Sequence, residues 1–367
     1  MRRKITLIPI TLFLFLVTFM SYGQEGHEDS HAADEPKKDQ KTEIKEYIQH
    51  HLQDSYDFGL FSWVNDSGEH KHFGFPLPVI LWDNGLKVFS SSKFHHGETV
   101  AEVDGSYYKV HHAKIYKVDG PNGEIIEDED YHATNEKPLD FSITKNVTMI
   151  FMVFAILFFM FSRMAMSYKK NNGLPTGTGR LLEPIVLYVR DEIAIPNIGE
   201  KHYKRYMSYL LTVFFFVWIV NLFGLTPIGM NLTNNIAVTF CLAIITYLIT
   251  TFSGNANYWK HIFWMPGVPV PMKIILAPIE LLGTFIKPFA LMIRLYANIT
   301  AGHIVLMSII GMMFVFNNWI GSSLSFLLAF VLGILELLVA ALQAYIFTVL
   351  SALYFGMAVE EHHDEAH

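Results

Sequence analysis

The sequence contains very little cysteine and little charge. Cys241 is its single cysteine, so no disulfide can form within the chain and the redox compartment cannot be read from it. Charged residues make up only 17% of the 367 residues, and the net charge of −7 leaves no basic excess for binding nucleic acid. Instead, 51% of the residues are hydrophobic, 30 of them are Phe, and the mean hydropathy is +0.30. This composition predicts a membrane protein with a soluble part.

The first residues have the form of an export signal. A basic start at residues 2–4 is followed by an apolar stretch at 5–19 and by small residues at 21–23. This pattern predicts a signal peptide over residues 1–23, with an uncleaved signal anchor as the alternative. In both cases the segment that follows lies outside the cytoplasm.

Residues 24–140 have the composition of a small exported domain. Its start, at 25–46, is charged and poor in apolar residues, which is typical of disorder or of a solvated helix. Alternating runs flank an Asn-Gly pair and predict a β-hairpin over 79–90, and we expect another strand region at 106–118. The sequence therefore predicts a β-rich domain.

This segment holds 11 of the chain's 17 histidines. Three adjacent pairs are His50-His51, His95-His96 and His111-His112. Metal capture is one interpretation, but no pair has the spacing of a dedicated site and no cysteine assists. The pattern favours ordinary surface histidines, and we expect neither a metal site nor a cofactor.

From residue 141 to residue 360 the chain reads as a membrane domain. Five apolar segments are long enough to cross a bilayer, and the last two must tilt steeply or break. They are residues 147–161, 207–225, 236–252, 274–316 and 324–357. The sequence therefore predicts an all-α membrane fold that ends in a long, tilted helical hairpin.

Positive charge assigns the sides of the membrane. The connection at 163–205 carries eight Lys and Arg residues, whereas 227–235 and 317–323 carry none. By the positive-inside rule the first connection is cytoplasmic and the other two are outside, which leaves a cytoplasmic tail at 361–367. Within the first connection, residues 181–195 are amphipathic and should lie along the membrane surface.

Arg294 is the most informative residue of the hairpin. It lies near the middle of an apolar segment, where an arginine costs roughly 2.5–3.5 kcal/mol to insert and cannot lose its proton. Glu280, Lys287 and Arg294 recur every seven residues and therefore share one helix face to within about 20° per step. Asn298 follows Arg294 by one turn. The alternative is a structural arginine paired with a buried carboxylate.

Further polar residues lie on both sides of Arg294 along the hairpin. His303 is nine residues further on, about 13 Å along the axis and on roughly the opposite face. On the returning helix, Gln343 can come level with Arg294 or Asn298, and Glu336 then lies near the level of His303. An imidazole and a carboxylate at membrane depth suit a proton relay, although each could instead make a structural hydrogen bond between helices.

These motifs resemble subunit a of the membrane sector of F-type ATP synthases. The resemblance is closest in Pro278-Ile-Glu280, Lys287-Pro288, Arg294-Leu-Tyr-Ala-Asn298-Ile-Thr-Ala-Gly302 and Leu342-Gln343-Ala-Tyr-Ile-Phe347. The stretches at 188–199 and 221–227 also look like that family, so the resemblance covers about 147–360. The long exported domain is a departure from the family pattern.

The resemblance implies a non-catalytic, proton-translocating stator subunit in a bacterial inner membrane. Its partners would be a rotating ring of small hairpin subunits and a peripheral stalk. Arg294 would meet the ring carboxylate, His303 and Glu336 would form the outer half-channel, and Glu280 would belong to the cytoplasmic one. Asn298 and Gln343 would be the polar residues beside the arginine.

A stand-alone secondary transporter with an exported ligand- or metal-binding domain is the alternative function. Such transporters are usually built from internal repeats with broken helices in both halves. No repeat is visible here, and the polar residues gather in one hairpin. The pattern therefore favours the synthase subunit.

Overall fold

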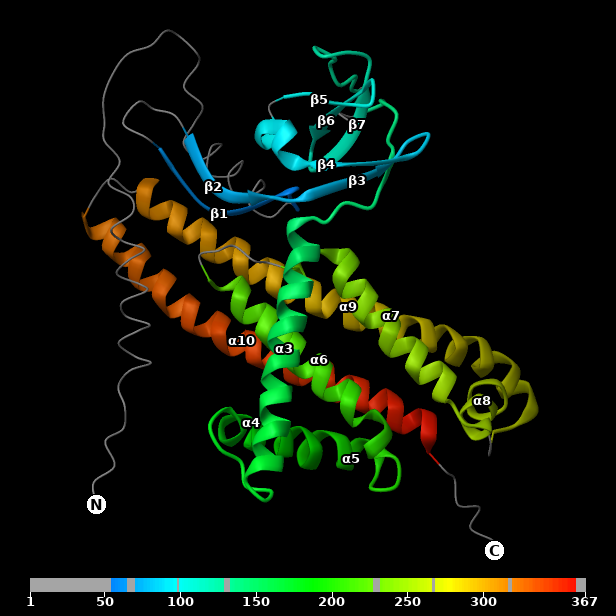
Figure 1. Cartoon of the computed structure of the whole chain (residues 1–367). Helices are drawn as coiled ribbons and strands as arrows, with labels where there is room; N and C mark the ends of the chain where they lie inside the picture. Colours follow the sequence, from blue (N-terminus) through cyan, green and yellow to red (C-terminus); the bar gives the residue numbers. More distant parts are fainter. Residues whose placement is uncertain are drawn as a thin grey trace, which may run out of the picture. The chain divides into compact units, whose positions relative to one another are not determined.

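The computed structural model describes residues 54–64, 70–97, 99–128, 133–226, 232–265, 268–315 and 319–360. The predicted signal peptide, the charged start, the His50-His51 pair and the acidic tail lie outside these residues. In the described part, short strands come first and long apolar helices follow (Figure 1). The predicted fold class, an all-α membrane region preceded by a β-rich region, is confirmed.

The β-rich region consists of three small antiparallel sheets. Each strand pairs mainly with its neighbour in the sequence, which is typical of hairpins joined by short turns. The sheets are β1 (Asp57–Val64) with β2 (His70–Pro76); β4 (Leu86–Ser90), β3 (Pro78–Trp82) and β8 (Leu139–Asp140); and β5 (Ala101–Val103), β6 (Ser106–His111) and β7 (Lys114–Val118). A 3-10 helix, η1 (Ser91–Gly97), follows β4.

The predicted hairpin at 79–90 is confirmed, because β3 and β4 pair in register from Pro78 with Ser90 to Trp82 with Leu86. The strand region expected at 106–118 is two strands rather than one. β6 pairs with β7 from Tyr107 with Val118 to His111 with Lys114, around a two-residue turn. The turn was missed because its residues are His-Ala, which is not a usual turn pair.

At the core of the β-rich region, a buried carboxylate pairs with a partly exposed lysine. Alternation on β3 turns Val79 and Leu81 inward, where both are fully buried. Beside them, Asp83 accepts a hydrogen bond of 2.8 Å from the Tyr108 hydroxyl and lies 2.9 Å from Lys117 Nζ. The lysine and the hydroxyl stabilise the carboxylate, so the pKa of Asp83 is lowered.

Five helices are long and apolar enough to span a membrane, and each matches one predicted segment. They are α3 (Lys145–Lys170), α6 (Tyr203–Gly224), α7 (Ile236–Ser253), α9 (Val270–Val315) and α10 (Trp319–Val359). α3 runs well beyond the apolar run at 147–161, because polar residues continue the helix as far as Lys170. The chain is thus a multi-pass membrane protein.

The two hairpin helices are unusually long. α9 has 46 residues and α10 has 41, so at 1.5 Å per residue they extend about 69 and 62 Å. A hydrocarbon core is only about 30 Å thick, so both helices must tilt steeply to keep their apolar surface within it. Neither is broken, although α9 contains Pro278 and Pro288.

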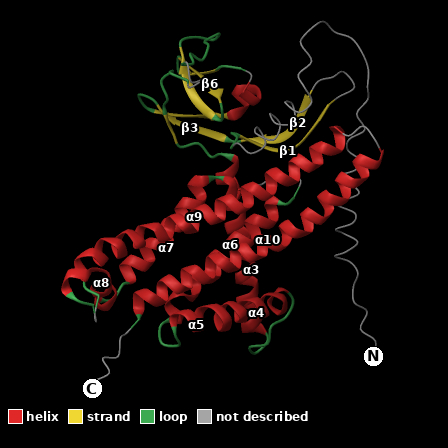
Figure 2. Ribbon diagram, turned by 180° about the vertical axis from the view of Figure 1, so that it is seen from behind, coloured by secondary structure: helices red, strands yellow, loops and turns green. Residues whose placement is uncertain are grey.

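The long helices pack around this hairpin. α9 and α10 lie side by side, α7 lies along α9, and α6 packs against α10 (Figures 1 and 2). Buried side chains of α6 and α10 join in one apolar core, including Phe214, Val217, Phe347 and Phe355. The hairpin is therefore covered on one side by α6 and α7, while large apolar side chains remain exposed elsewhere along it.

The connection between α3 and α6 is helical, as the amphipathic stretch at 181–195 predicts. It contains α4 (Thr178–Tyr188), the π-helical turn η2 (Val189–Ala194) and α5 (Ile195–Ile198). α5 packs closely on the end of α10 at Gly356. The approach is so close that a Cβ at residue 356 would collide with the carbonyl oxygen of Asn197. The remaining short helices are η3 (Leu232–Asn234) and α8 (Ala256–Phe263).

Candidate functional site

Arg294 projects from α9 onto an exposed face of the chain. Ala290, Ala297 and Ala301, which lie one or two turns away on the same side, are exposed as well. Among the described residues, no carboxylate lies within ion-pairing distance of the Arg294 guanidinium. The interpretation of Arg294 as half of a structural ion pair thus finds no partner in the described chain.

One turn further along α9, the hairpin carries a polar pair. Asn298 Nδ2 donates a hydrogen bond of 3.0 Å to Gln343 Oε1 on α10. Gln343 is only 1% exposed, and its Nε2 atom has no hydrogen-bond partner among the described residues. This contact puts Gln343 on the level that the antiparallel geometry predicts. It also leaves a buried donor, Gln343 Nε2, about one helical turn from the level of Arg294.

His303 and Glu336 line one cavity, which we call the His303 cavity. Both side chains are buried, with exposed fractions of 7% and 8%. The cavity has a volume of about 220 Å³, part of which is open to the outside, and is lined by Asn221, Gly224, Leu225, Ile299, His303, Glu336 and Ala340. The imidazole and the carboxylate of the two hairpin helices therefore share one space, as their predicted levels require.

Asn221 of α6 is a member of this site that the analysis of the hairpin missed. Its Oδ1 accepts a hydrogen bond of 3.1 Å from the Thr233 hydroxyl, and its Nδ2 donates one of 3.4 Å to the Ala340 carbonyl of α10. The signal in the sequence was an uncharged polar residue at the end of an apolar segment. Such a side chain places a buried amide in the wall of the cavity.

Gly302 allows the carboxylate of Glu336 to lie close to α9. A Cβ placed on Gly302 would come within 3.2 Å of Glu336 Oε1, which is tighter than an ordinary contact. Oε2 of the same carboxylate is buried and has no hydrogen-bond partner in the described chain. A side chain at residue 302 would therefore press on this acid and shift its carboxylate.

If His303 and Glu336 form the half-channel that the resemblance implies, we expect Gly302→Val to lower ion translocation by about tenfold, because the added side chain displaces the carboxylate from the cavity. Gly283→Val is the matched control, since the space around a Cβ at residue 283 of the same helix is open. Translocation is measured in vesicles that hold equal amounts of each variant. Equal rates for the two variants would show that the carboxylate position is unimportant.

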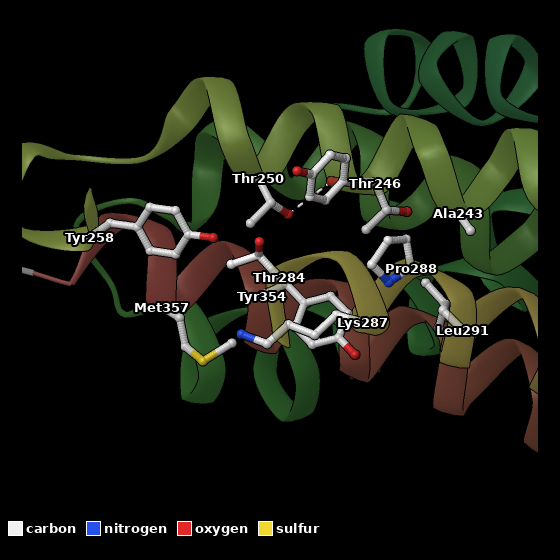
Figure 3. A pocket seen from close by; sticks show the side chains of 11 residues that line it. Ala243, Thr246, Thr250, Tyr258, Thr284, Lys287, Pro288, Leu291, Tyr354 and Met357 are labelled. Atoms are coloured by element: carbon white, nitrogen blue, oxygen red, sulfur yellow. Dashed lines mark hydrogen bonds between the residues drawn. The ribbon is translucent and has the colours of Figure 1, made fainter. Parts of the chain in front are cut away.

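A second cavity lies on the other side of Arg294, and we call it the Lys287 cavity. It has a volume of about 320 Å³, part of which is open to the outside, between α7, α8, α9 and α10. Its lining is rich in hydroxyl groups, and Lys287 lies along its floor (Figure 3). The polar residues that line it are Thr246, Tyr247, Thr250, Tyr258, Thr284, Lys287 and Tyr354.

Local structure supplies this second cavity with hydrogen-bonding groups. Pro288 has no N–H, so the carbonyl of Thr284 lacks its usual helical donor. The Thr284 hydroxyl donates to Leu281 O at 2.7 Å, and the Lys287 ammonium lies 5.7 Å from the centre of the Tyr354 ring. These groups could hold water or pass a proton along α9.

The three residues of the seven-residue repeat have different surroundings in the structure. Lys287 lines a cavity, Arg294 is exposed, and Glu280 is half-buried but outside the lining of either cavity. Seven residues correspond to about 10.5 Å along the helix axis, so successive members of the repeat face different parts of the neighbouring helices. Glu280 and Lys287 were predicted from the sequence, but the threonines and tyrosines that α7, α8 and α10 contribute were not.

Two protein-family models match this chain. The family model described as ATP synthase A chain matches residues 147–356, which include the helices of the site except for the last three residues of α10. A second model, described as a domain of unknown function, matches residues 47–141. The two matches together follow the division between the helical region and the β-rich region.

Curated relatives agree with the first match. The chain is 45% identical over 237 residues to ATP synthase subunit a of Chloroherpeton thalassium, which covers 62% of this chain and 70% of the relative. It is 42% identical over 236 residues to ATP synthase subunit a 2 of Chlorobaculum tepidum, with 62% and 66% covered. For ATP synthase subunit a of Myxococcus xanthus the identity is 42% over 239 residues, with 62% and 77% covered.

Proposed function

The chain belongs to the ATP synthase A chain family, and on that basis we propose that it is the ion-conducting stator subunit of an F-type ATP synthase. It resides in a bacterial inner membrane with its β-rich domain outside and its C-terminus in the cytoplasm. Its partners are a rotating ring of small hairpin subunits and a peripheral stalk. It does not itself form or break ATP.

The exposed face around Arg294 is the surface that meets the ring. A ring carboxylate is neutral while it faces lipid, because burying its anion is costly. Opposite Arg294 the anion is favoured, so the carboxyl group loses its proton there. The exposed alanines beside Arg294 let a ring helix approach closely, as small residues do between membrane helices.

The His303 cavity is the outer half-channel. It places a carboxylate and an imidazole in one buried space, with the Asn221 amide in its wall. Both ionisable groups bind and release protons, and water in the cavity links them to the outside. A proton taken up here passes along the hairpin toward the level of Asn298 and Gln343 and reloads a ring carboxylate.

The Lys287 cavity is the start of the cytoplasmic half-channel. It lies on the side of Arg294 toward Glu280, which is the cytoplasmic side when residues 163–205 face inward by the positive-inside rule. Its hydroxyl groups offer donors and acceptors for a chain of water molecules. Arg294 separates the two cavities, and its fixed charge repels a proton that would cross directly between them.

The observation that carries this proposal is the exposed Arg294 between two cavities, each lined in part by polar side chains. To test the proposal, the gene for this chain is deleted, and the chain is then expressed again in the deletion cells. Restored ATP-driven acidification of inverted vesicles, together with co-purification of ring and stalk subunits, is the expected result. A chain that transports a solute while purifying without a ring would instead support the secondary transporter.

A further inference from the structure

The β-rich region carries a cluster of three ligand-type side chains that the proposed ion path does not use. His111 ends β6, His112 opens the turn after it, and Glu127 comes from the segment beyond β7. One donor atom from each of the three side chains lies within 4.8 Å of the other two. We propose that His111, His112 and Glu127 form a binding site for a divalent transition-metal ion of the Zn²⁺ type.

The arrangement of His111 and Glu127 is compatible with ligands that share one metal ion. His111 Nε2 lies 3.0 Å from Glu127 Oε1, and yet this buried nitrogen makes no geometrically acceptable hydrogen bond with the described residues. Two donors bound to the same tetrahedral Zn²⁺ at about 2.0–2.1 Å are about 3.3 Å apart. The two atoms are therefore spaced like neighbouring ligands and are not aligned as a donor with its acceptor.

The backbone of the turn provides an independent observation. His112 and Ala113 both have positive φ angles, of 44° and 58°. A two-residue turn of this kind favours Asn-Gly or Asp-Gly, since a Cβ makes the left-handed conformation unfavourable. The turn between β5 and β6 follows that preference, with Asp104-Gly105 at φ angles of 49° and 73°.

The β6–β7 turn therefore departs from the rule that the neighbouring hairpin obeys. His112 occupies the position where Asn or Asp is the ordinary residue. Left-handed conformations away from glycine often mark functional positions, where another interaction determines the conformation. Here the conformation brings the two adjacent imidazoles together, with ring centres 4.1 Å apart. In an ordinary strand the side chains of consecutive residues would point to opposite faces.

Two imidazoles and one carboxylate are a ligand set that Zn²⁺ accepts, and the fourth position is left for water. His112 and Glu127 are exposed and His111 is half-buried, so the cluster is open to solution at His112 and Glu127. The sequence alone favoured plain surface histidines. Glu127 is 15 residues away from His112, and no short metal-binding motif links it to the histidines. The bound ion would join the β6–β7 turn to the segment that carries Glu127.

Titration of the purified full-length chain in detergent with ZnCl₂, followed by calorimetry, tests this proposal. The decisive variant is His112→Asn, because asparagine suits the positive φ angle while it removes the imidazole. The control is His95→Asn, which replaces an exposed histidine that also has a positive φ angle, of 41°, but lies outside the cluster.

The wild type and His95→Asn are expected to bind one equivalent of Zn²⁺ with affinities within twofold of each other. His112→Asn is expected to bind that equivalent at least tenfold more weakly while melting no earlier than the wild type without metal. Glu127→Gln, which leaves the turn intact, should lose affinity in the same way. Identical isotherms for the wild type, His112→Asn and Glu127→Gln would overturn the proposal, and so would a wild type that binds no Zn²⁺.

Discussion

Replacing Arg294 by alanine is expected to reduce ATP-driven proton pumping to background. Without the guanidinium, the ring carboxylate must either stay protonated at this point or lie as an unpaired anion in an apolar interface. Removing one partner of a buried ion pair costs about 3–5 kcal/mol, which corresponds to a loss on the order of 100-fold or more in rate. Pumping is measured by acidification of inverted vesicles that contain the assembled complex.

Two controls make this result specific. Arg163→Ala removes an exposed arginine from α3 and should leave pumping unchanged. Arg294→Lys keeps a cation but one that can lose its proton when buried, so it should fall between the wild type and alanine. ATP hydrolysis by the soluble head should persist in all three. Normal pumping by an assembled complex that carries Arg294→Ala would remove the proposed role of this residue.

The second large effect is expected at Glu336. Glu336→Gln preserves the size of the side chain but removes its ability to take up a proton. Because Glu336 and His303 are the two ionisable groups that line the His303 cavity, we expect pumping to fall at least tenfold. Glu336→Asp keeps the carboxylate on a shorter side chain and should recover part of the rate.

A buried polar residue of the same helix serves as the control for Glu336. Thr348 is fully buried on α10, and its hydroxyl donates a hydrogen bond of 2.8 Å to the carbonyl oxygen of Ala344 in the same helix. Thr348→Val should therefore leave pumping within about twofold of the wild type. If Thr348→Val were as damaging as Glu336→Gln, the loss at Glu336 would reflect packing and not proton transfer.

Part of the site could be predicted from the sequence because helix geometry alone sets it. The rise of 1.5 Å per residue and the seven-residue spacing of Glu336 and Gln343 determine the level of each side chain along an antiparallel hairpin. The hydrogen bond from Asn298 to Gln343 and the shared cavity of His303 and Glu336 follow from those levels. Apolar length likewise predicted all five membrane helices.

Other features depend on which elements pack together, and periodicity does not specify that. The Lys287 cavity takes its threonines and tyrosines from α7, α8 and α10 as well as from α9. Asn221 reaches the His303 cavity only because α6 packs against α10. Long-range packing of this kind decides which polar residue of an apolar helix meets another, so these members of the site were not predicted.

The β-rich region shows the same limit on a smaller scale. Its β3–β4 hairpin was predictable because Asn84-Gly85 is a recognisable turn pair. The β6–β7 hairpin was missed, since His112 and Ala113 belong to no standard turn signature. Its proximity to Glu127 depends on the path of the chain after β7, which leaves no regular pattern in the sequence.

Photo-cross-linking from the face of α9 that carries Arg294 tests most directly whether this face meets the ring. A benzophenone is attached to cysteine in Ala297→Cys, in a Cys241→Ser background, and the assembled complex is irradiated. Phe154→Cys on α3, which is also exposed, is the matched control. We expect position 297 to label the small ring subunit and position 154 not to label it. The proposed role of Arg294 would be contradicted if position 297 gave no ring product in a complex that still pumps protons.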